Sequence, residues 1–366
     1  MNKYRIIHLI TTIERGGAEK QLLILTQEQV AQNLDIEIFY LKGIPELKEE
    51  FERIGAKVNS SLANQSFFSQ VLKFRRIQRS NNFFIHTHLP QAELLAALSC
   101  KKKSFVISRH NFEPFWPKKP RFISTILSKY VSSRAVHVVA ISHAIKDYLL
   151  SSNEVAKNLK ITVVYYGFNN QRTKPRSMNQ INDMELNSTS DFKIGTIGRL
   201  VPGKNYQTLL SALAQVCKVN PRIKLFIVGD GTSKNELLEL AQNLDLTENI
   251  IWLGRTEHID EFLQKIDLFV FPSLGEGFGL VLLEAMLASK PIIAANNSAI
   301  PEVLGASYSG LFPTTDSKIL SQKILEVVGD SLESQNLVDE YSKQIQLFSS
   351  KEMADKILNI YTQYGF

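Results

Sequence analysis

Short apolar runs alternate with segments of helical period along the chain. In the first half, runs of strand length cover residues 5–12, 36–41, 83–86, 105–108, 136–141 and 161–164. Segments with helical spacing of apolar residues lie between them, at 22–30, 45–53, 66–80, 91–99, 119–133 and 142–150. Buried strands that alternate with helices are typical of a parallel sheet covered on both faces. The pattern therefore predicts an α/β domain.

The second half repeats the alternation after an interruption. Residues 169–191 lose the periodicity and are rich in Asn, Ser, Thr and Arg, which is typical of a linker. Strand-like runs then begin at 192, 224, 250, 266 and 291. Because 366 residues are many for one core, we expect two α/β domains. Their bounds are 1–170 and 192–350, joined by a linker at 171–191, with a last helical segment at 351–366.

Composition narrows the class of protein. Hydrophobic residues make up 44% and charged residues 21% of the chain, as in ordinary globular proteins. No apolar run approaches the roughly 20 residues that span a bilayer, and the first residues carry no signal-cleavage pattern. Cys100 and Cys217 lack the spacing of metal ligands, so we expect free thiols in a reducing compartment. These features predict a cytoplasmic protein.

The charge is divided unevenly. Residues 1–180 hold 27 Lys and Arg against 13 Asp and Glu, whereas the rest hold 15 against 23. No acid stands between Glu52 and Glu93, and in the helical segment 66–80 basic residues such as Arg75, Arg76 and Arg79 interleave with phenylalanines. Such a helix can lie on the anionic inner face of a cell membrane. The alternative is a solvated helix whose apolar residues face the core. Nucleic acid is not expected, since no recognised nucleic-acid motif accompanies the charge.

The stretch from 266 to 286 carries the strongest chemical signal. A buried strand ends at Pro272, glycines occupy alternate positions of the following loop, and a helix begins near Leu280. Free N–H groups at such a helix start favour an anion such as a phosphate. Glu276 and Glu284 flank this start, where they could hold hydroxyl groups of a sugar or ribose. Alternatively, Glu276 merely complements the helix dipole.

Two further turns could meet a phosphate. Arg199 and Lys204 bracket a Pro-Gly turn before a helix, and a guanidinium with an ammonium suits a diphosphate. Gly16 and Gly17 follow the first strand. They form either an ordinary tight turn or a place where backbone N–H groups contact a ligand.

Histidines gather near the ends of two strands, His86 and His88 on one and His110 after the next. His86 and His88 share a face, but two histidines without a Cys or a nearby acid are too few for a metal site. The chain also contains no Asp-x-Asp. We therefore expect neither a bound metal nor a divalent-metal requirement.

The glutamate, seven residues and glutamate of 276–284, preceded by Gly-Arg-Leu and Lys at 198–204, closely resemble the signature of retaining GT-B glycosyltransferases of the family-4 type. The resemblance covers nearly the whole chain. It implies two Rossmann-like domains facing a cleft, with the helix at 351–366 crossing back to the first domain. One departure is that Ser298 and Ala299 stand where the family commonly has glycines.

The resemblance also implies roles for single residues. Arg199 and Lys204 would hold the donor diphosphate, Glu284 the ribose, and Glu276 and His110 the transferred sugar. The remaining donor-site residues by resemblance are Gly16, Gly17, Gly279, Leu280 and Val281.

The implied activity is that of a hexosyltransferase. It would move a hexose-type sugar from a nucleotide-diphospho-sugar to an acceptor hydroxyl, with retention and without a cofactor. The expected acceptor is a lipid-linked glycan or oligosaccharide in surface polysaccharide biosynthesis, such as capsule or O-antigen. A nucleotide-sugar epimerase of the same fold and a non-enzymatic nucleotide-sugar-binding scaffold remain alternatives. The sugar, the base and the acceptor stay open.

Overall fold

The computed structural model describes residues 5–79, 83–117, 119–168, 186 and 191–365. The chain divides into two compact units, Met1–Asn170 with Phe348–Phe366 and Gln171–Leu347. The linker expected at 171–191 lies outside the described residues except for Leu186 and Asp191. Each unit is described by itself below.

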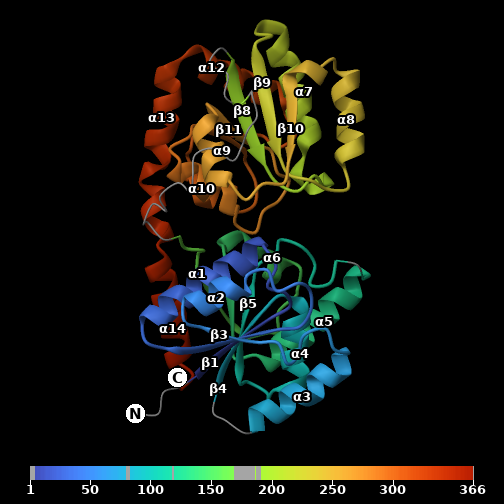
Figure 1. Ribbon diagram of the computed structural model, residues 1–366, viewed down its shortest axis with the longest axis vertical. Helices are drawn as coiled ribbons and strands as arrows, with labels where there is room; N and C mark the ends of the chain where they lie inside the picture. Colours follow the sequence, from blue (N-terminus) through green and yellow to red (C-terminus); the bar gives the residue numbers. More distant parts are fainter. Residues whose placement is uncertain (1–4, 80–82, 118, 169–185, 187–190, 366) are drawn as a thin grey trace. The chain divides into compact units, whose positions relative to one another are not determined.

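A seven-stranded parallel sheet forms the centre of the first unit (Figure 1), with strand order β3-β2-β1-β4-β5-β6-β7. Both faces of β1 are buried, as expected of a largely apolar strand in a parallel sheet, and His8 is buried among its apolar residues. The strands are β1 Arg5–Ile10, β2 Asp35–Tyr40, β3 Lys57–Asn59, β4 Phe83–His88, β5 Phe105–Arg109, β6 His137–Ala140 and β7 Lys160–Val163. Among these seven strands, only the short strand β3 has no counterpart in the predicted elements.

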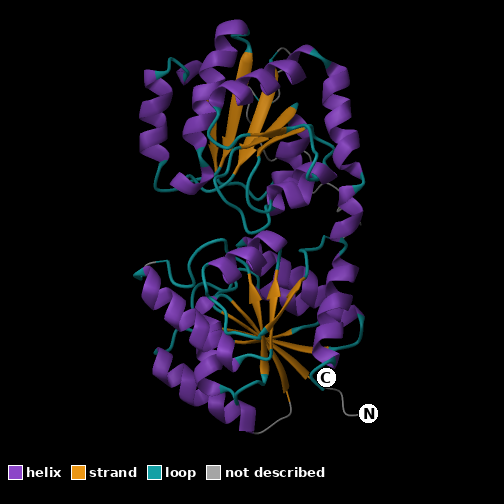
Figure 2. Cartoon of the chain, turned by 180° about the vertical axis from the view of Figure 1, so that it is seen from behind, coloured by secondary structure: helices purple, strands orange, loops and turns teal. Residues whose placement is uncertain are grey.

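Helices cover both faces of this sheet (Figure 2). They are α1 Gly17–Ala31, α2 Lys48–Arg53, α3 Phe67–Arg79, α4 Pro90–Ser99, α5 Arg121–Arg134, α6 His143–Ser151 and α14 Ser350–Thr362. The last of these, α14, packs on α1 and buries Met353, Ile357 and Tyr361 in the core of the first unit. The prediction that the last helix returns to the first domain is confirmed.

The second unit contains a six-stranded parallel sheet with strand order β10-β9-β8-β11-β12-β13. The strands are β8 Phe192–Ile197, β9 Ile223–Val228, β10 Ile250–Gly254, β11 Leu268–Phe271, β12 Ile292–Ala295 and β13 Leu311–Phe312. The helices are α7 Tyr206–Val219, α8 Lys234–Asn243, α9 Ile259–Lys265, α10 Leu280–Leu287, α11 Ile300–Leu304, α12 Ser317–Gly329 and α13 Ser331–Ser342, with short 3₁₀ turns η1 Pro202–Lys204, η2 Thr247–Asn249 and η3 Gln344–Phe348. The predicted fold class, two Rossmann-like α/β sheets, is confirmed.

The strand orders locate the loops that can bind a ligand. In each sheet the chain first adds strands to one side and then returns to the other, so the order reverses between β1 and β4 and between β8 and β11. Ligands of such sheets bind beyond the carboxyl ends of the strands at this reversal. In the second unit, the loops that follow β8 and β11 therefore flank the expected site.

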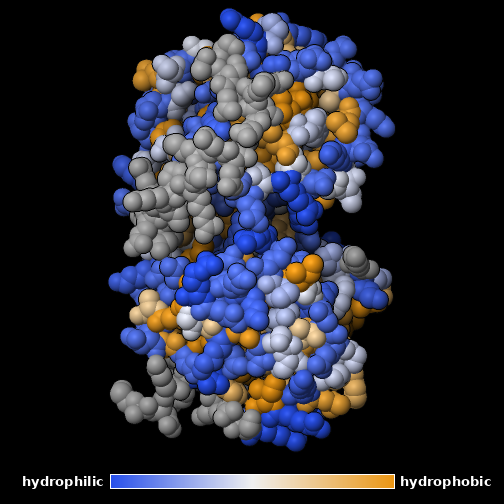
Figure 3. All heavy atoms as spheres, in the orientation of Figure 1, coloured by the Kyte–Doolittle hydropathy of each residue, from blue (hydrophilic) through white to orange (hydrophobic). Residues whose placement is uncertain are grey.

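Helices α3 and α5 of the first unit carry several exposed apolar side chains. Helices α3, α4 and α5 are neighbours, and hydrophobic atoms interrupt the hydrophilic surface over this region in Figure 3. The exposed side chains are Phe68 (73%) and Leu72 (44%) on α3 and Phe122 (67%), Ile126 (62%) and Tyr130 (40%) on α5. We call these five residues the α3–α5 patch. No helix in the described part of the chain is long and apolar enough to cross a bilayer.

Candidate active site

An ion pair joins the two loops at the reversal of the second sheet. Lys204 Nζ, in the loop after β8, binds Glu276 Oε1, in the loop after β11. Ser273 Oγ donates a hydrogen bond to the same carboxylate oxygen at 2.6 Å. The Lys204 ammonium also lies 5.4 Å from the centroid of the Phe271 ring, within the range of a cation–π contact. Lys204 and Glu276, which lie 72 positions apart in the sequence, thus form one ion pair.

Asn205 explains why the two loops meet. It ends the η1 turn in a left-handed conformation, with φ 55°, which Asn adopts more readily than most residues. Its amide Nδ2 donates to the carbonyl of Pro272 at 3.1 Å and to that of Thr314 at 2.9 Å. These bonds tie the loop after β8 to the loop after β11 and hold Lys204 beside Glu276.

The helix start predicted to receive an anion is present. Gly279 precedes α10 with φ 90° and ψ 59°, and no side chain caps the helix. The first backbone N–H groups of an α-helix have no partner inside the helix, so those at the start of α10 can receive a ligand oxygen. The first turn of α10 contains no acid. Glu276 lies outside the helix and Glu284 in its second turn, so an acidic helix start does not account for them.

Ser298 accounts for the departure from the family pattern. Its φ is 48°, a left-handed value at which glycine is least strained. Its hydroxyl accepts a hydrogen bond from the backbone N–H of Glu276 at 2.8 Å and donates one to Asn297 Oδ1 at 2.8 Å. Ser298 therefore keeps the backbone conformation of a glycine position and adds a hydroxyl that fixes Glu276. The sequence marked the departure but did not reveal this contact.

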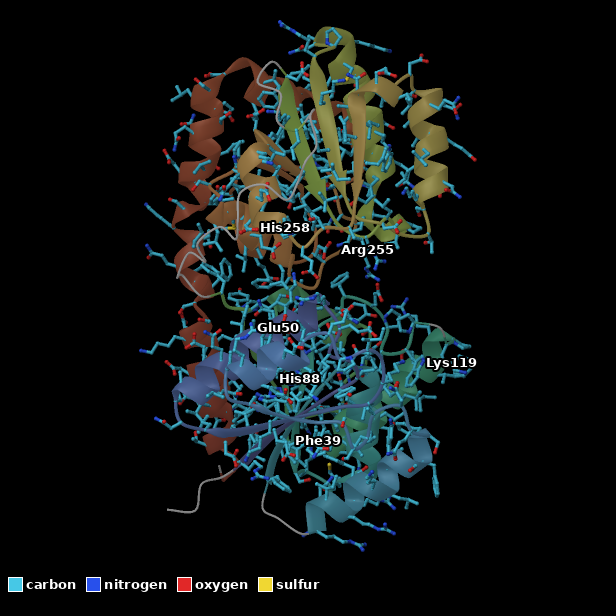
Figure 4. All side chains as sticks on the ribbon, viewed as in Figure 1. Phe39, Glu50, His88, Lys119, Arg255 and His258 are labelled. Atoms are coloured by element: carbon cyan, nitrogen blue, oxygen red, sulfur yellow. The ribbon has the colours of Figure 1, made fainter. Side chains whose placement is uncertain are left out.

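Arg199 lies near this group in the chain but is not joined to it. It follows β8, and its side chain is exposed. Among the described residues, its guanidinium makes no hydrogen bond or ion pair. The structure thus brings Lys204, Glu276 and the α10 start together and leaves Arg199 unengaged on the adjoining loop. Figure 4 shows another exposed cation, Arg255, on the loop after β10.

In the first unit, the glycine turn faces a carboxylate. Gly16 caps α1, and a Cβ atom at Gly16 would lie 2.3 Å from Glu19 Oε2. Thr12 Oγ1 donates to Glu19 Oε1 at 2.6 Å, and burial raises the pKa of Glu19. The close approach of Glu19 therefore explains Gly16 without a ligand. This contact favours the tight-turn interpretation of Gly16 and Gly17, and sequence analysis did not identify Glu19.

His110 directly follows β5, and both of its ring nitrogens have partners. Nε2 lies 3.1 Å from His88 Nδ1, and Nδ1 lies 2.5 Å from the hydroxyl of Tyr166. Burial, together with the charge of the adjacent Arg109, lowers the pKa of His110 to about 3. The imidazole is therefore neutral at physiological pH.

A third buried histidine joins the two that the sequence singled out. His8 on β1 pairs in register with His86 on β4, so His8, His86 and His88 lie on one face, inside the strands rather than beyond their ends. Figure 4 shows His88 among the strands of the first unit. Sequence analysis missed His8, because its place beside His86 depends on the pairing of β1 with β4.

These three histidines are the one group in the described chain whose ligand atoms lie close enough for a metal, all within 4.8 Å. Their nitrogens are already engaged, however. His8 bonds His88 at 3.0 Å and Gln29 Oε1 at 2.8 Å. His86 bonds Tyr361 at 2.6 Å and Ser108 at 2.8 Å. A metal ion would have to break these bonds and would place its charge in the core without a carboxylate ligand, which is unfavourable.

Comparisons with known proteins identify the family. The family model described as glycosyl transferases group 1 matches residues 177–345, and the model described as glycosyltransferase family 4 matches residues 15–172. Together they cover nearly the whole chain, including both loops of the Lys204–Glu276 pair.

Individual relatives are distant but extend over most of the chain. The capsular polysaccharide biosynthesis glycosyltransferase CapM of Staphylococcus aureus is 23% identical over 381 residues, which cover 100% of this chain and 98% of CapM. The putative glycosyltransferase EpsF of Bacillus subtilis is 22% identical and covers 80% of this chain and 79% of its own. The structure of Anabaena HepE in complex with UDP-glucose aligns with a TM-score of 0.82 at 21% identity, over 98% of this chain and 99% of HepE. The chain therefore belongs to the group 1, family-4 glycosyltransferases and is a glycosyltransferase with the GT-B fold.

Proposed function

We propose that this enzyme transfers a hexose-type sugar from a nucleotide-diphospho-sugar to an acceptor hydroxyl with retention of the anomeric configuration. The observation that carries the proposal is the Lys204–Glu276 pair beside the uncapped start of α10. Both features lie at the carboxyl ends of parallel strands, where the order of the second sheet reverses.

Lys204 resolves an apparent conflict of charges. Glu276 beside a diphosphate would repel it, but the ammonium of Lys204 already neutralises the carboxylate. An ammonium has three donors, so Lys204 can keep its bond to Glu276 and still donate to phosphate oxygens. The leaving diphosphate gains negative charge as the bond to the sugar breaks. Lys204, the N–H groups of Gly279, Leu280 and Val281, and the unengaged Arg199 would stabilise that charge.

Glu276 would then hold the transferred sugar. Ser273 and Lys204 both bind Oε1, and within the described residues Oε2 makes no hydrogen bond. That oxygen can accept from a sugar hydroxyl while the rest of the carboxylate stays fixed. In the same proposal, Glu284 binds the ribose hydroxyls and His110 contacts the sugar. UDP-sugars are the first donors to test, because the HepE structure holds UDP-glucose.

The proposed acceptor is a lipid-linked glycan in the assembly of a surface polysaccharide. Support comes from CapM, whose name states capsular polysaccharide biosynthesis, and from the α3–α5 patch. Exposed Arg76 and Arg79 lie on α3, beside its two patch residues. Apolar side chains with flanking cations suit an anionic membrane surface. We propose that the first unit binds the cytoplasmic face of the membrane there, as a peripheral protein.

The residues of α3 differ in how well they suit the proposed contact. Val71 and Phe74 are buried, so the alternative of core-facing apolar residues holds for those two. The Arg75 guanidinium donates to the carbonyl of Leu98 at 2.7 Å, which gives it a role at the end of α4. Arg76 and Arg79, rather than Arg75, are therefore the cations to test.

Turnover and donor binding together test the proposed reaction. We expect Lys204→Met and Glu276→Gln to lower sugar transfer by about 10²–10³, and Lys204→Met also to reduce the thermal shift that UDP causes in the wild type. Lys265→Met is the matched control, because Lys265 pairs with Glu261 in the same unit at similar exposure. Full activity of both site variants would refute the site.

Analysis of the products distinguishes sugar transfer from the two alternatives, an epimerase and a non-enzymatic scaffold. A sugar isomerised without any acceptor would indicate an epimerase. Donor binding without turnover, with every lipid-linked and oligosaccharide acceptor tried, would indicate a scaffold.

A further inference from the structure

A continuous line of hydrogen bonds runs through the core of the first unit to His110. Gln29 Oε1 lies 2.8 Å from His8 Nε2, and His8 Nδ1 lies 3.0 Å from His88 Nε2. The line continues from His88 Nδ1 to His110 Nε2 at 3.1 Å and ends with His110 Nδ1 and the Tyr166 hydroxyl at 2.5 Å. Helix α1, strands β1 and β4 and the loop after β5 thus contribute successive members.

Each imidazole in this line carries one proton. His8 and His88 are fully or almost fully buried, burial and the charge of Arg109 lower the pKa of His110, and none of the hydrogen bonds of the line involves a carboxylate. A buried imidazole without an acidic partner is neutral, so one ring nitrogen donates and the other accepts. Each hydrogen bond between two rings contains a single proton. The nitrogen that carries the proton in one ring therefore determines which nitrogen carries it in the next ring.

We propose that Gln29, His8 and His88 are positioning residues that fix His110 in the tautomer with its proton on Nε2. The Gln29 carbonyl oxygen can only accept, so His8 Nε2 carries the proton and His8 Nδ1 accepts from His88 Nε2. By the same step, His88 Nδ1 accepts from His110 Nε2. The Nδ1 atom of His110 is left as an acceptor, occupied by the Tyr166 hydroxyl.

The fixed tautomer lets His110 distinguish substrate groups that donate a hydrogen bond from those that can only accept one. A substrate hydroxyl that replaces the Tyr166 hydroxyl at His110 Nδ1 must donate its proton, and a substrate group that can only accept is refused. That last step rests on the proposed role of His110 at the sugar, whereas the tautomer itself does not. The tautomer can therefore be tested without any activity.

His86 provides a matched control within the same cluster. It is as buried as His88, and their ring centroids lie 4.3 Å apart. Its nitrogens bond Tyr361 and Ser108, however, and not a member of the line. Replacing His86 or His88 by Phe removes a buried imidazole of similar shape in each case, but only His88→Phe interrupts the line to His110.

Nitrogen NMR of the full chain labelled with ¹⁵N-histidine is the direct test. In the wild type at pH 7 we expect His110 to be neutral with its proton on Nε2. In Gln29→Met and His88→Phe we expect a mixture of tautomers at His110, and in His86→Phe the wild-type tautomer. A proton on His110 Nδ1 or a charged His110 in the wild type overturns the proposal. So does a tautomer that His88→Phe leaves unchanged.

Kinetics and metal analysis complete the test. With the donor, Gln29→Met should lower kcat/KM by about tenfold, the size of one lost hydrogen bond, and His86→Phe should change it less. Unchanged kinetics with an altered tautomer would refute the role of His110 at the sugar and leave the positioning proposal intact. Zinc added to the wild type should leave the three histidine spectra unchanged, and a stoichiometric zinc complex at His8 and His88 overturns the hydrogen-bonded line.

Discussion

Arg109 Nε lies 2.9 Å from Glu93 Oε2 in the interior of the first unit. A second carboxylate, that of Glu154, lies 3.7 Å from Arg109 Nη1. All three side chains are buried, so one guanidinium faces two acids. Burial, opposed by Arg109 and reinforced by Glu154, raises the pKa of Glu93 to about 7. A proton on Glu93 balances the charges of the group.

The first prediction concerns Glu93 and pH. Its folded-state pKa lies above the ordinary value of 4.5, so the folded state binds more protons and stability falls as pH rises from about 4.5 to 7. The loss from this group is on the order of 3 kcal/mol. Glu93→Gln should remove that loss, whereas Glu113→Gln, at an exposed site, should not. Urea unfolding at several pH values measures the free energy of unfolding. If this free energy depends on pH in the same way in the wild type and in Glu93→Gln, the prediction is wrong.

The second prediction concerns acid and the buried histidines. Burial lowers the pKa of His8 to about 4 and that of His110 to about 3. Because these values lie below the unfolded value of about 6.5, the stability they contribute is present above pH 6.5 and is lost as pH falls toward 4. The second unit contains a single histidine, His258. We therefore expect the first unit to unfold at a higher pH than the second.

Two tryptophans make this difference measurable. The chain has only Trp116 and Trp252, one in each unit. Trp252→Phe leaves a reporter for the first unit, and Trp116→Phe leaves one for the second. If both units unfold at the same pH, or if the unit of Trp252 unfolds at the higher pH, destabilisation by histidine protonation is excluded.

Local sequence patterns predicted the elements well because their apolar periods are strong. The largely apolar run of β1 predicted a buried strand, and the four apolar residues of the last helix predicted one packed face. The motifs also pointed to Glu276 and Lys204, which the structure joins in an ion pair. The short strands β3 and β13 could not, because two or three residues carry no readable period.

Contacts between segments that are distant in the sequence could not be predicted. His8 joins His88 only through the register of β1 against β4, and Glu19 reaches Gly16 only after α1 has formed. Ser298 fixes Glu276 from a loop 22 positions away. Such contacts depend on which strands pair and how loops fold back, and a single sequence contains no local signal for either.

Gly279 should be intolerant of a side chain. Its φ is 90° and an added Cβ would lie 3.0 Å from Leu282 Cδ1, so Gly279→Ala must strain or shift the start of α10. We expect a loss of about 1–3 kcal/mol in stability and weaker binding of UDP. Gly203→Ala is the control, since that site has open space and no positive φ. Calorimetry measures both effects, and equal behaviour of the two variants would refute the strain.

Two substitutions of Ser298 distinguish the effect of its hydrogen bond from the effect of its backbone strain. Ser298→Gly relieves the left-handed φ of 48° but loses the hydroxyl on Glu276, whereas Ser298→Ala loses the hydroxyl and keeps the strain. The Ala variant should be less stable than the Gly variant by about 1 kcal/mol. Both should lose sugar transfer to a similar extent. An Ala variant as active as the wild type would show that the hydroxyl does not position Glu276.

The last prediction concerns the α3–α5 patch and its cations. Exposed apolar side chains and flanking arginines bind anionic lipid by burial and by charge, with about 1 kcal/mol for each cation near the surface. Arg76→Glu with Arg79→Glu should therefore reduce binding to vesicles that contain phosphatidylglycerol, and Phe122→Ser should reduce it independently of salt. Lys218→Glu with Lys343→Glu makes the same change of charge at exposed sites of the second unit and should bind as the wild type does. Co-sedimentation measures all three. If the control loses as much binding as the α3 variant, net charge and not this surface directs the protein to the membrane.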